Sequence, residues 1–191
     1  MLYKREIVAV VISILLVILA GCRIKKDAAR TSSTGQINGS TPAHTDYSDQ
    51  STWLLGYFSP ERLLRPPYSE WFYKEYDHYR PDVEVIERLK KTGNEGLDIT
   101  VVMGTWCPDS RREVPRFMNI IDKLNFPEDK LTFIGVDNSK QSPIGGFDTL
   151  NIEWVPTFIF LKNKVEAGRI IENPEASLEQ DMLNILTRNE K

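Results

Sequence analysis

The hydrophobic pattern divides the chain into an apolar start, a polar stretch and a long segment with the periodicities of helices and strands. The apolar start covers residues 7–19 and is broken only by Ser13. Residues 23–50 contain almost nothing to bury, which is typical of a flexible tether. Apolar residues return from Trp53 onward, so the folded part is predicted to follow the tether.

Helices are predicted where apolar residues recur about every three or four positions. The predicted helices cover residues 69–80, 83–91, 108–124 and 177–189, after a short helical turn at 61–64. Asp82 and Ser177 stand at the start of two of them, where a side-chain oxygen accepts hydrogen bonds from free N–H groups of the first turn. The aromatic stripe of the first helix is interpreted as core, with a substrate surface as the alternative.

Strands are predicted from runs of β-branched and aromatic residues between these helices. The runs cover residues 97–103, 131–136, 157–161 and 165–171, and a further first strand is expected within 53–58. A strand–helix–strand unit followed by a hairpin predicts a parallel pair and then an antiparallel pair. We therefore expect an α/β fold with a central mixed sheet of four to five strands and helices on both faces. Residues 82–191 would form this domain, behind an N-terminal helical extension at 51–81.

Composition then narrows the possible functions. Of the 191 residues, 41% are hydrophobic and 27% are charged, which excludes a wholly disordered or collagen-like chain. The net charge of −3 leaves no basic surface of the kind that nucleic-acid binding requires, so no nucleic-acid partner is expected. The cysteines and histidines, at positions 22, 44, 78 and 107, lie far outside zinc-site spacing, so neither a metal nor a cofactor is expected.

Residues 1–21 have the character of an export signal. Two basic residues precede the apolar run, whose length as a helix is about 20 Å, short of the roughly 30 Å of a bilayer core. Residues 19–22, Leu-Ala-Gly-Cys, resemble the bacterial lipobox, which implies that Cys22 is lipidated and that residues 22–50 tether the domain to a membrane. A signal anchor or a plain signal peptide is the alternative. The expected location is the periplasmic side of the cell envelope, and Arg23 favours the outer membrane.

Cys107 stands where a predicted strand ends and the helix at 108–124 begins. Pro108 suits the first helical position, because its φ is already helical and it has no N–H to leave unpaired. A sulfur here faces the free N–H groups and the positive dipole end of the helix, which favour thiolate and predict a depressed pKa. A buried, inert cysteine is the alternative interpretation, and the surrounding Trp-Cys-Pro-Asp-Ser argues against it.

Residues 104–110, Gly-Thr-Trp-Cys-Pro-Asp-Ser, together with residues 155–157, Val-Pro-Thr, resemble the active site of the thioredoxin-like superfamily. In that family a Trp-Cys-x-x-Cys motif at a helix start faces a cis-proline. The resemblance implies a thioredoxin fold in which an extended substrate chain lies beside Cys107. The residues that it implies for substrate binding are Trp106, Pro108, Val155 and Pro156, with Pro156 cis.

Glu113, six residues after Cys107, is similar to an acidic residue of the extracytoplasmic TlpA/ResA-like branch of this superfamily. Its expected role is either to shuttle protons or to pair with Arg112 or another base. The resemblance covers roughly residues 83–189. Members of this branch are usually tethered outside the cytoplasm, in agreement with the expected export and lipidation at Cys22.

The chain departs from the family pattern at Ser110, which takes the place of the second cysteine. In the family that thiol resolves the mixed disulfide, and a serine hydroxyl cannot form a disulfide. Cys22 cannot replace it if its sulfur carries lipid. The expected catalytic residues are therefore Cys107 as the single thiol, Ser110 as a hydrogen-bond donor to the sulfur, and Glu113.

These residues predict a monothiol thiol–disulfide oxidoreductase or isomerase that acts through a mixed disulfide on Cys107. Its partners would be protein disulfides or thiols and an external thiol or redox protein, and the chain is expected to be a monomer. The alternative is a redox-inactive module that uses the same groove to bind a peptide or to capture a partner. A one-cysteine peroxidase fits less well, because Gly104 stands where peroxiredoxins have Thr or Ser.

Overall fold

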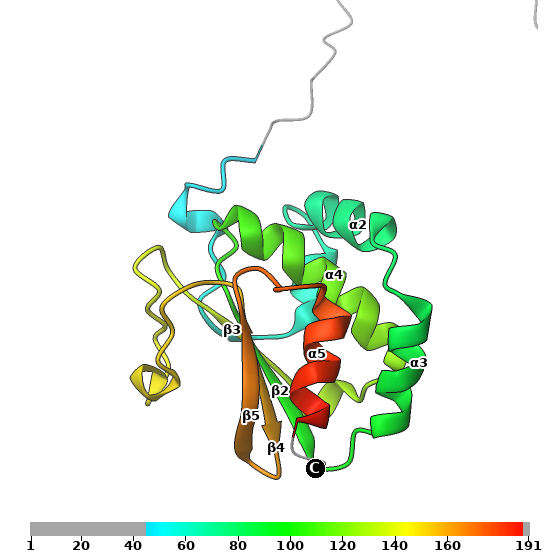
Figure 1. Ribbon diagram of the computed structural model, residues 1–191. Coiled ribbons are helices and arrows are strands. Elements are labelled where there is room, and N and C mark those ends of the chain that lie inside the picture. The colour runs from blue at the N-terminus through cyan, green and yellow to red at the C-terminus, as the bar shows by residue number, and fades with distance from the viewer. Residues whose placement is uncertain (1–44, 189–191) are drawn as a thin grey trace, which may run out of the picture. The chain divides into compact units, whose positions relative to one another are not determined.

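The computed structural model describes residues 45–188, which form an α/β fold around a five-stranded mixed sheet (Figure 1). The strands are β1 (Gly56–Phe58), β2 (Leu97–Met103), β3 (Leu131–Gly135), β4 (Thr157–Lys162) and β5 (Val165–Ile171). Their order in the sheet is β1-β3-β2-β4-β5. β2 and β3 are parallel, whereas the β1–β3, β2–β4 and β4–β5 pairs are antiparallel. The predicted parallel pair, antiparallel hairpin and additional first strand are confirmed.

The described residues contain four α-helices close to their predicted positions. They are α2 (Ser69–His78), α3 (Val83–Thr92), α4 (Pro108–Leu124) and α5 (Leu178–Thr187). Short 3₁₀ helices lie at Gln50–Thr52 (η1), Pro60–Leu64 (η2), Glu128–Lys130 (η3) and Phe147–Leu150 (η4). Asp82 caps α3 by accepting from two backbone N–H groups, and Ser177 caps α5 by accepting from Gln180 N. Both predicted caps are confirmed.

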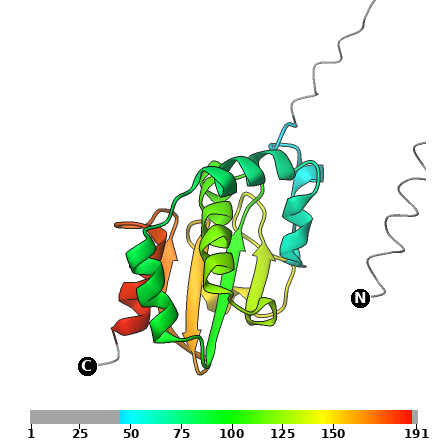
Figure 2. The same cartoon turned by 90° about the vertical axis from the view of Figure 1, so that its right-hand side faces the viewer.

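The four α-helices all pack on one face of the sheet (Figure 2). Ile99, Val101 and Met103 of β2 point into the same buried cluster as the inward residues of the helices, as alternation along a strand requires. Val102 points to the opposite face, where a second cluster is completed by the loop after β3 and its 3₁₀ helix η4. The expectation of helices on both faces is therefore corrected, because a loop with one 3₁₀ turn covers the second face.

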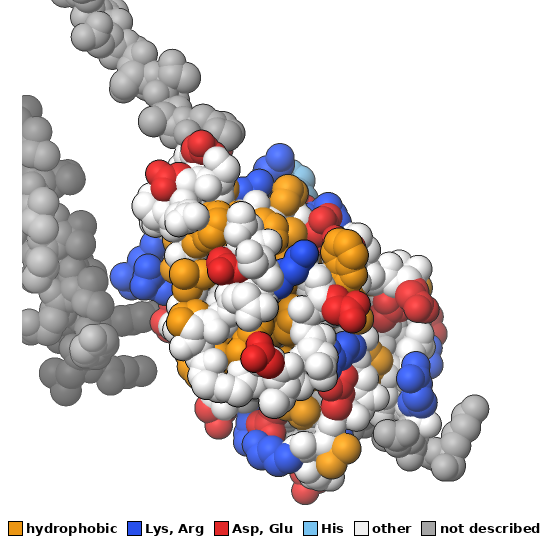
Figure 3. Space-filling model, turned by 90° about the vertical axis from the view of Figure 1, so that its left-hand side faces the viewer, with side chains coloured by type: hydrophobic (Ala, Val, Ile, Leu, Met, Phe, Trp, Pro, Cys, Tyr) orange, Lys and Arg blue, Asp and Glu red, His pale blue; other side chains and the backbone are white. Residues whose placement is uncertain are grey.

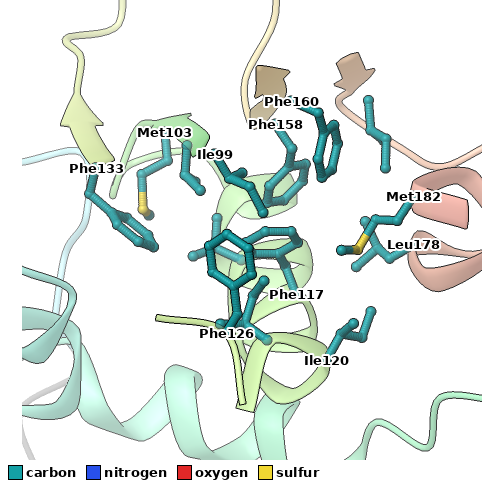
Figure 4. Close-up of a cluster of buried hydrophobic side chains, with 14 of the residues drawn as sticks. Ile99, Met103, Phe117, Ile120, Phe126, Phe133, Phe158, Phe160, Leu178 and Met182 are labelled. Carbon is teal, nitrogen blue, oxygen red and sulfur yellow. The ribbon is translucent and has the colours of Figure 1, made fainter. Parts of the chain in front are cut away.

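Aromatic packing between α4 and β4 forms the centre of the main core (Figure 4). Phe117 and Phe158 have no exposed surface, and their ring centroids are 4.6 Å apart. Phe133 and Met182 reach the same cluster from β3 and α5. This core fixes α4 against the sheet, so the start of α4 has a defined position at the ends of the strands.

The segment before the domain is part of the same fold rather than a separate helical extension. β1 lies within 51–81 and adds an antiparallel edge strand to β3. The folded part also begins before the expected boundary at 51: the Tyr47 hydroxyl donates to Pro67 O at 2.6 Å, and Trp53 Nε1 donates to Tyr47 O at 3.0 Å. The predicted export signal, Cys22 and most of the predicted tether lie outside the described residues.

Buried Glu179 joins α5 to the junction between α2 and α3. Its carboxylate accepts from the Tyr79 hydroxyl at 2.6 Å and from Asp82 N at 3.0 Å. Burial and this hydrogen bond raise the pKa of Tyr79 well above its usual range, so the tyrosine remains the donor.

Within residues 45–188, no helix is long and apolar enough to cross a bilayer.

Candidate functional site

Cys107 occupies the N-cap position of α4, at the carboxyl end of β2, as predicted. Its backbone N–H donates to Gly104 O at 3.0 Å, and its carbonyl accepts from Arg111 N at 3.1 Å. Pro108 follows as the first helical residue, where its missing N–H costs no hydrogen bond. A short turn from Gly104 thus places the sulfur at the start of a 17-residue helix.

The sulfur lies against the segment that precedes β4. Cys107 Sγ donates a hydrogen bond to Val155 O at 3.2 Å, a contact between residues 48 positions apart. The Val155–Pro156 peptide is cis, in agreement with the expectation for Pro156. Thr157 Oγ1 donates to Trp154 O at 2.6 Å, and Pro156 O accepts from Glu172 N at 2.7 Å. These bonds hold the segment that faces the sulfur.

Cys107 is only 6% exposed and belongs to the apolar cluster on the loop-covered face of the sheet. The sequence motif predicts that Cys107 is not buried, and this prediction is wrong. Cys107 is buried although it stands at the start of a helix. The hydrogen bond to Val155 O requires the protonated thiol, because a thiolate has no proton to donate. Ionisation of Cys107 would therefore break this contact.

Ser110 is fully buried on the first turn of α4. Its Oγ accepts a hydrogen bond from Gly104 N at 3.3 Å. The sulfur of Cys107 donates to Val155 O instead, so the expected hydrogen bond from Ser110 to the sulfur is not made in this structure. Ser110 here stabilises the turn that carries Cys107.

A Ser110→Cys substitution is expected to create an internal disulfide with Cys107. Helix geometry places the Cα atoms of residues three apart at about 5 Å, within the Cα range that a disulfide spans. In a Cys22→Ser background, mild oxidation should protect both thiols from alkylation, as measured by mass spectrometry. Ser139→Cys, on an exposed loop, is the matched control and should keep two free thiols. Two free thiols in the Ser110→Cys chain would contradict the described helix start.

Glu113 is a buried carboxylate held by two arginines. Its Oε1 accepts from Arg112 Nε at 2.6 Å and from Arg116 Nη1 at 3.2 Å. Arg112 also pairs with Asp109 at 2.6 Å, and Arg116 pairs with Glu75 at 2.7 Å. Of the two expected roles, the structure shows the ion pair with Arg112. These ion pairs connect α4 to α2, because Arg116 of α4 pairs both with Glu113 on its own helix and with Glu75 on α2.

Trp106 lies beside the sulfur but faces the N-terminal segment. Its Nε1 donates to Val136 O at 2.9 Å, and its ring centroid is 6.4 Å from that of Trp53. Together with Tyr47, Arg111 and other residues these rings line a pocket of about 430 Å³. The predicted role of Trp106 in a substrate groove thus corresponds to one wall of a hollow whose other walls come from residues 45–53, Arg111 and Asn138.

Several residues near the site were not singled out by the sequence pattern. Thr105 is 1% exposed. Its hydroxyl donates to Thr52 O and accepts from Leu54 N, and these bonds join the turn before Cys107 to the N-terminal segment.

Trp154, directly before Val155, is 53% exposed, and Lys140 Nζ lies 5.2 Å from the centroid of its ring. Apolar side chains gather among charged ones on the face that carries this loop (Figure 3). A tryptophan that fits no strand or helix pattern was the available signal for Trp154.

The part of the chain between residues 45 and 188 holds no cluster of three or more His, Cys, Asp or Glu side chains that could bind a metal. Comparison with protein families and with curated proteins finds no match. A solved structure of a Pseudomonas aeruginosa protein of unknown function is similar at 16% identity and a TM-score of 0.40, covering 63% of this chain and 70% of that one.

Proposed function

We propose that the protein is a monothiol thiol–disulfide oxidoreductase or isomerase with a thioredoxin-like fold, tethered to a membrane in the cell envelope through Cys22. The fold is supported by the strand order, by the parallel pair β2–β3 followed by the β4–β5 hairpin, and by a cysteine at the start of α4. The observation that carries the function is the 3.2 Å contact between Cys107 Sγ and Val155 O. It places the single described thiol against the bend at Val155 and Pro156 that leads into β4, beside which a peptide chain can align.

Catalysis begins with loss of the thiol proton. Cys107 is the N-cap residue of α4, and the free N–H groups and positive dipole end of a first helical turn favour an anion at such a position. Deprotonation breaks the hydrogen bond to Val155 O and frees that carbonyl for a substrate N–H. Because Cys107 is 6% exposed, the substrate must approach along the segment that contains Val155 and Pro156.

The thiolate then attacks one sulfur of a substrate disulfide. A bond forms between Cys107 Sγ and that sulfur, the substrate S–S bond breaks, and the second substrate sulfur leaves as a thiolate that takes up a proton. The described residues hold no second cysteine, and a lipidated Cys22 has no free thiol, so release needs a thiol from elsewhere. A further cysteine of the substrate can attack the mixed disulfide, which frees Cys107 and leaves the substrate with a rearranged disulfide. Alternatively, one external thiol displaces the reduced substrate and forms a disulfide with Cys107. A second external thiol then restores the Cys107 thiol and leaves as the external disulfide, so that the two external thiols together supply the two electrons of net reduction.

Trapping of the mixed disulfide tests this proposal. The full chain, incubated with a peptide disulfide and quenched with an alkylating reagent, is expected to carry the peptide on Cys107. The adduct should persist until a low-molecular-weight thiol is added, because Ser110 cannot displace the peptide. Mass spectrometry of the digested protein measures both steps. An unmodified Cys107 in the folded chain, with reaction only after unfolding, would contradict the proposal.

The alternative proposal is a peptide-binding module without turnover. Burial of Cys107 favours this alternative, because it protects the sulfur from reaction. In that case the segment at Val155 and the exposed Trp154 would bind the partner without covalent chemistry. The two proposals differ in their need for the Cys107 sulfur, as argued in the Discussion.

A further inference from the structure

Arg111 is a cation without an anionic partner in residues 45–188. It lies on the first turn of α4, and its Cζ is 4.4 Å from the centroid of the Tyr47 ring. Its neighbours Arg112 and Arg116 each pair with carboxylates, whereas no ion pair or side-chain hydrogen bond engages the Arg111 guanidinium within this range. Its Nη1 is shielded from solvent and has no acceptor. A shielded guanidinium donor without an acceptor is an unusual arrangement in a folded protein.

A second unsatisfied donor lies beside the same hollow. Trp71 Nε1, on α2, is buried and has no acceptor. Arg111 and Trp71 both line a pocket of about 240 Å³ between α2, α4 and the N-terminal segment. The other lining residues are Thr45, Tyr47, Glu70 and Lys74. The pocket therefore combines two cations, one carboxylate and an indole donor, with an aromatic wall.

We propose that this pocket binds an oxyanion, the carboxylate or phosphate group of a small ligand, between Arg111 and Trp71. A planar guanidinium binds such groups through two parallel hydrogen bonds, and the indole N–H supplies a further donor that has no acceptor in this structure. Lys74 adds a second positive charge against the single carboxylate of Glu70. The Tyr47 ring holds the guanidinium in place, because its own hydroxyl is fixed by the bond to Pro67 O.

The proposed anion site adjoins the cysteine site but does not depend on its chemistry. The Arg111 N–H donates to Cys107 O, so the two residues are one helical turn apart. Arg111 also lines the larger hollow with Trp106, which is next to Cys107 in the chain. Asp46 contributes a carboxylate to that larger hollow and none to the smaller one, so the smaller pocket is the more favourable place for an anion.

Titration of the full chain with sodium acetate and, separately, with sodium phosphate tests the proposal, against sodium chloride at equal ionic strength. The readout is the indole N–H resonance of Trp71, assigned with a Trp71→Phe variant. Binding should shift this resonance saturably, because the indole gains an acceptor, while the exposed Trp154 indole serves as an internal reference. A shift with acetate alone identifies a carboxylate ligand, and a stronger response to phosphate identifies a phosphate ligand.

Arg111→Gln is expected to weaken the binding of the responding anion about tenfold or more, since it removes a charge-assisted bidentate contact. Arg88→Gln removes the same charge from the exposed surface of α3 and should leave the affinity unchanged. Absence of a saturable shift with both anions, an equal shift with chloride, or unchanged binding in Arg111→Gln would overturn the proposal. None of these results depends on whether Cys107 exchanges disulfides.

Discussion

Cys107→Ala is expected to reduce the turnover of a peptide disulfide by an external thiol to the uncatalysed rate. The variant removes the only thiol among the described residues, and no other side chain near Val155 can form the mixed disulfide. The fold should survive, because the Cys107 side chain makes no capping hydrogen bond to α4. The rate of peptide reduction, followed with a fluorogenic disulfide substrate, measures the effect, and circular dichroism verifies the fold.

Cys22→Ala is the matched control, because it removes the other cysteine of the chain and should retain turnover of a soluble peptide. The same pair of variants separates the two proposals. If the wild type accelerates no exchange and Cys107→Ala binds the partner as tightly as the wild type does, the chain is a binding module. If Cys107→Ala retains accelerated exchange, a different group carries the chemistry and both proposals for Cys107 fail.

Phe117→Ala is expected to lower the free energy of unfolding by about 3–5 kcal/mol, the cost of removing a large aromatic side chain from a closed core. Phe117 has no exposed surface and its ring lies 4.6 Å from that of Phe158, between α4 and the sheet. Neighbouring side chains cannot refill such a space without leaving their own positions. Urea denaturation measures the change through the midpoint at constant slope.

Val83→Ala is the control for this measurement, because Val83 is 75% exposed on α3 and its truncation should change stability by less than about 0.5 kcal/mol. A loss below about 1 kcal/mol in Phe117→Ala would mean that the ring is not enclosed as described. Because α4 carries Cys107 at its start, Phe117→Ala also tests how far the site depends on the core. We expect peptide exchange to fall only in proportion to the unfolded fraction.

Much of the fold follows from local pattern. The apolar spacing places α4 and α5, and Asp82 and Ser177 are recognisable as caps, because capping is decided by residues within one turn of each other. The hairpin of β4 and β5 is equally local. The side of the sheet on which each helix packs is not local. The predicted second helical layer is replaced by the loop with η4, since nothing in the polar loop sequence shows which strand face it covers.

The candidate site also has one part that the local sequence predicts and another part that it does not. Cys107, Pro108 and the start of α4 are neighbours in sequence, so their arrangement can be predicted from a strand that ends and a helix that begins. The opposing Val155–Pro156 segment was expected only through a family resemblance, because 48 residues separate Val155 from Cys107. The i,i+3 spacing makes the pair of Glu113 with Arg116 possible, whereas the pair with the adjacent Arg112 and the contact of Arg116 with Glu75 on α2 depend on rotamers and packing.

By itself, the sequence determined that one cysteine begins a helix at a strand end, that a serine stands three residues after it, and that the chain has the elements of an α/β sheet. Only the tertiary structure decided that this cysteine is buried, that its thiol donates to Val155 O, and that Arg111 and Trp71 line one pocket, each with a donor that has no acceptor. The physical reason is the separation along the chain between the residues that determine each feature. Helix starts and caps are set by neighbours within a few residues, whereas burial and unpaired donors depend on every segment that the fold brings against them.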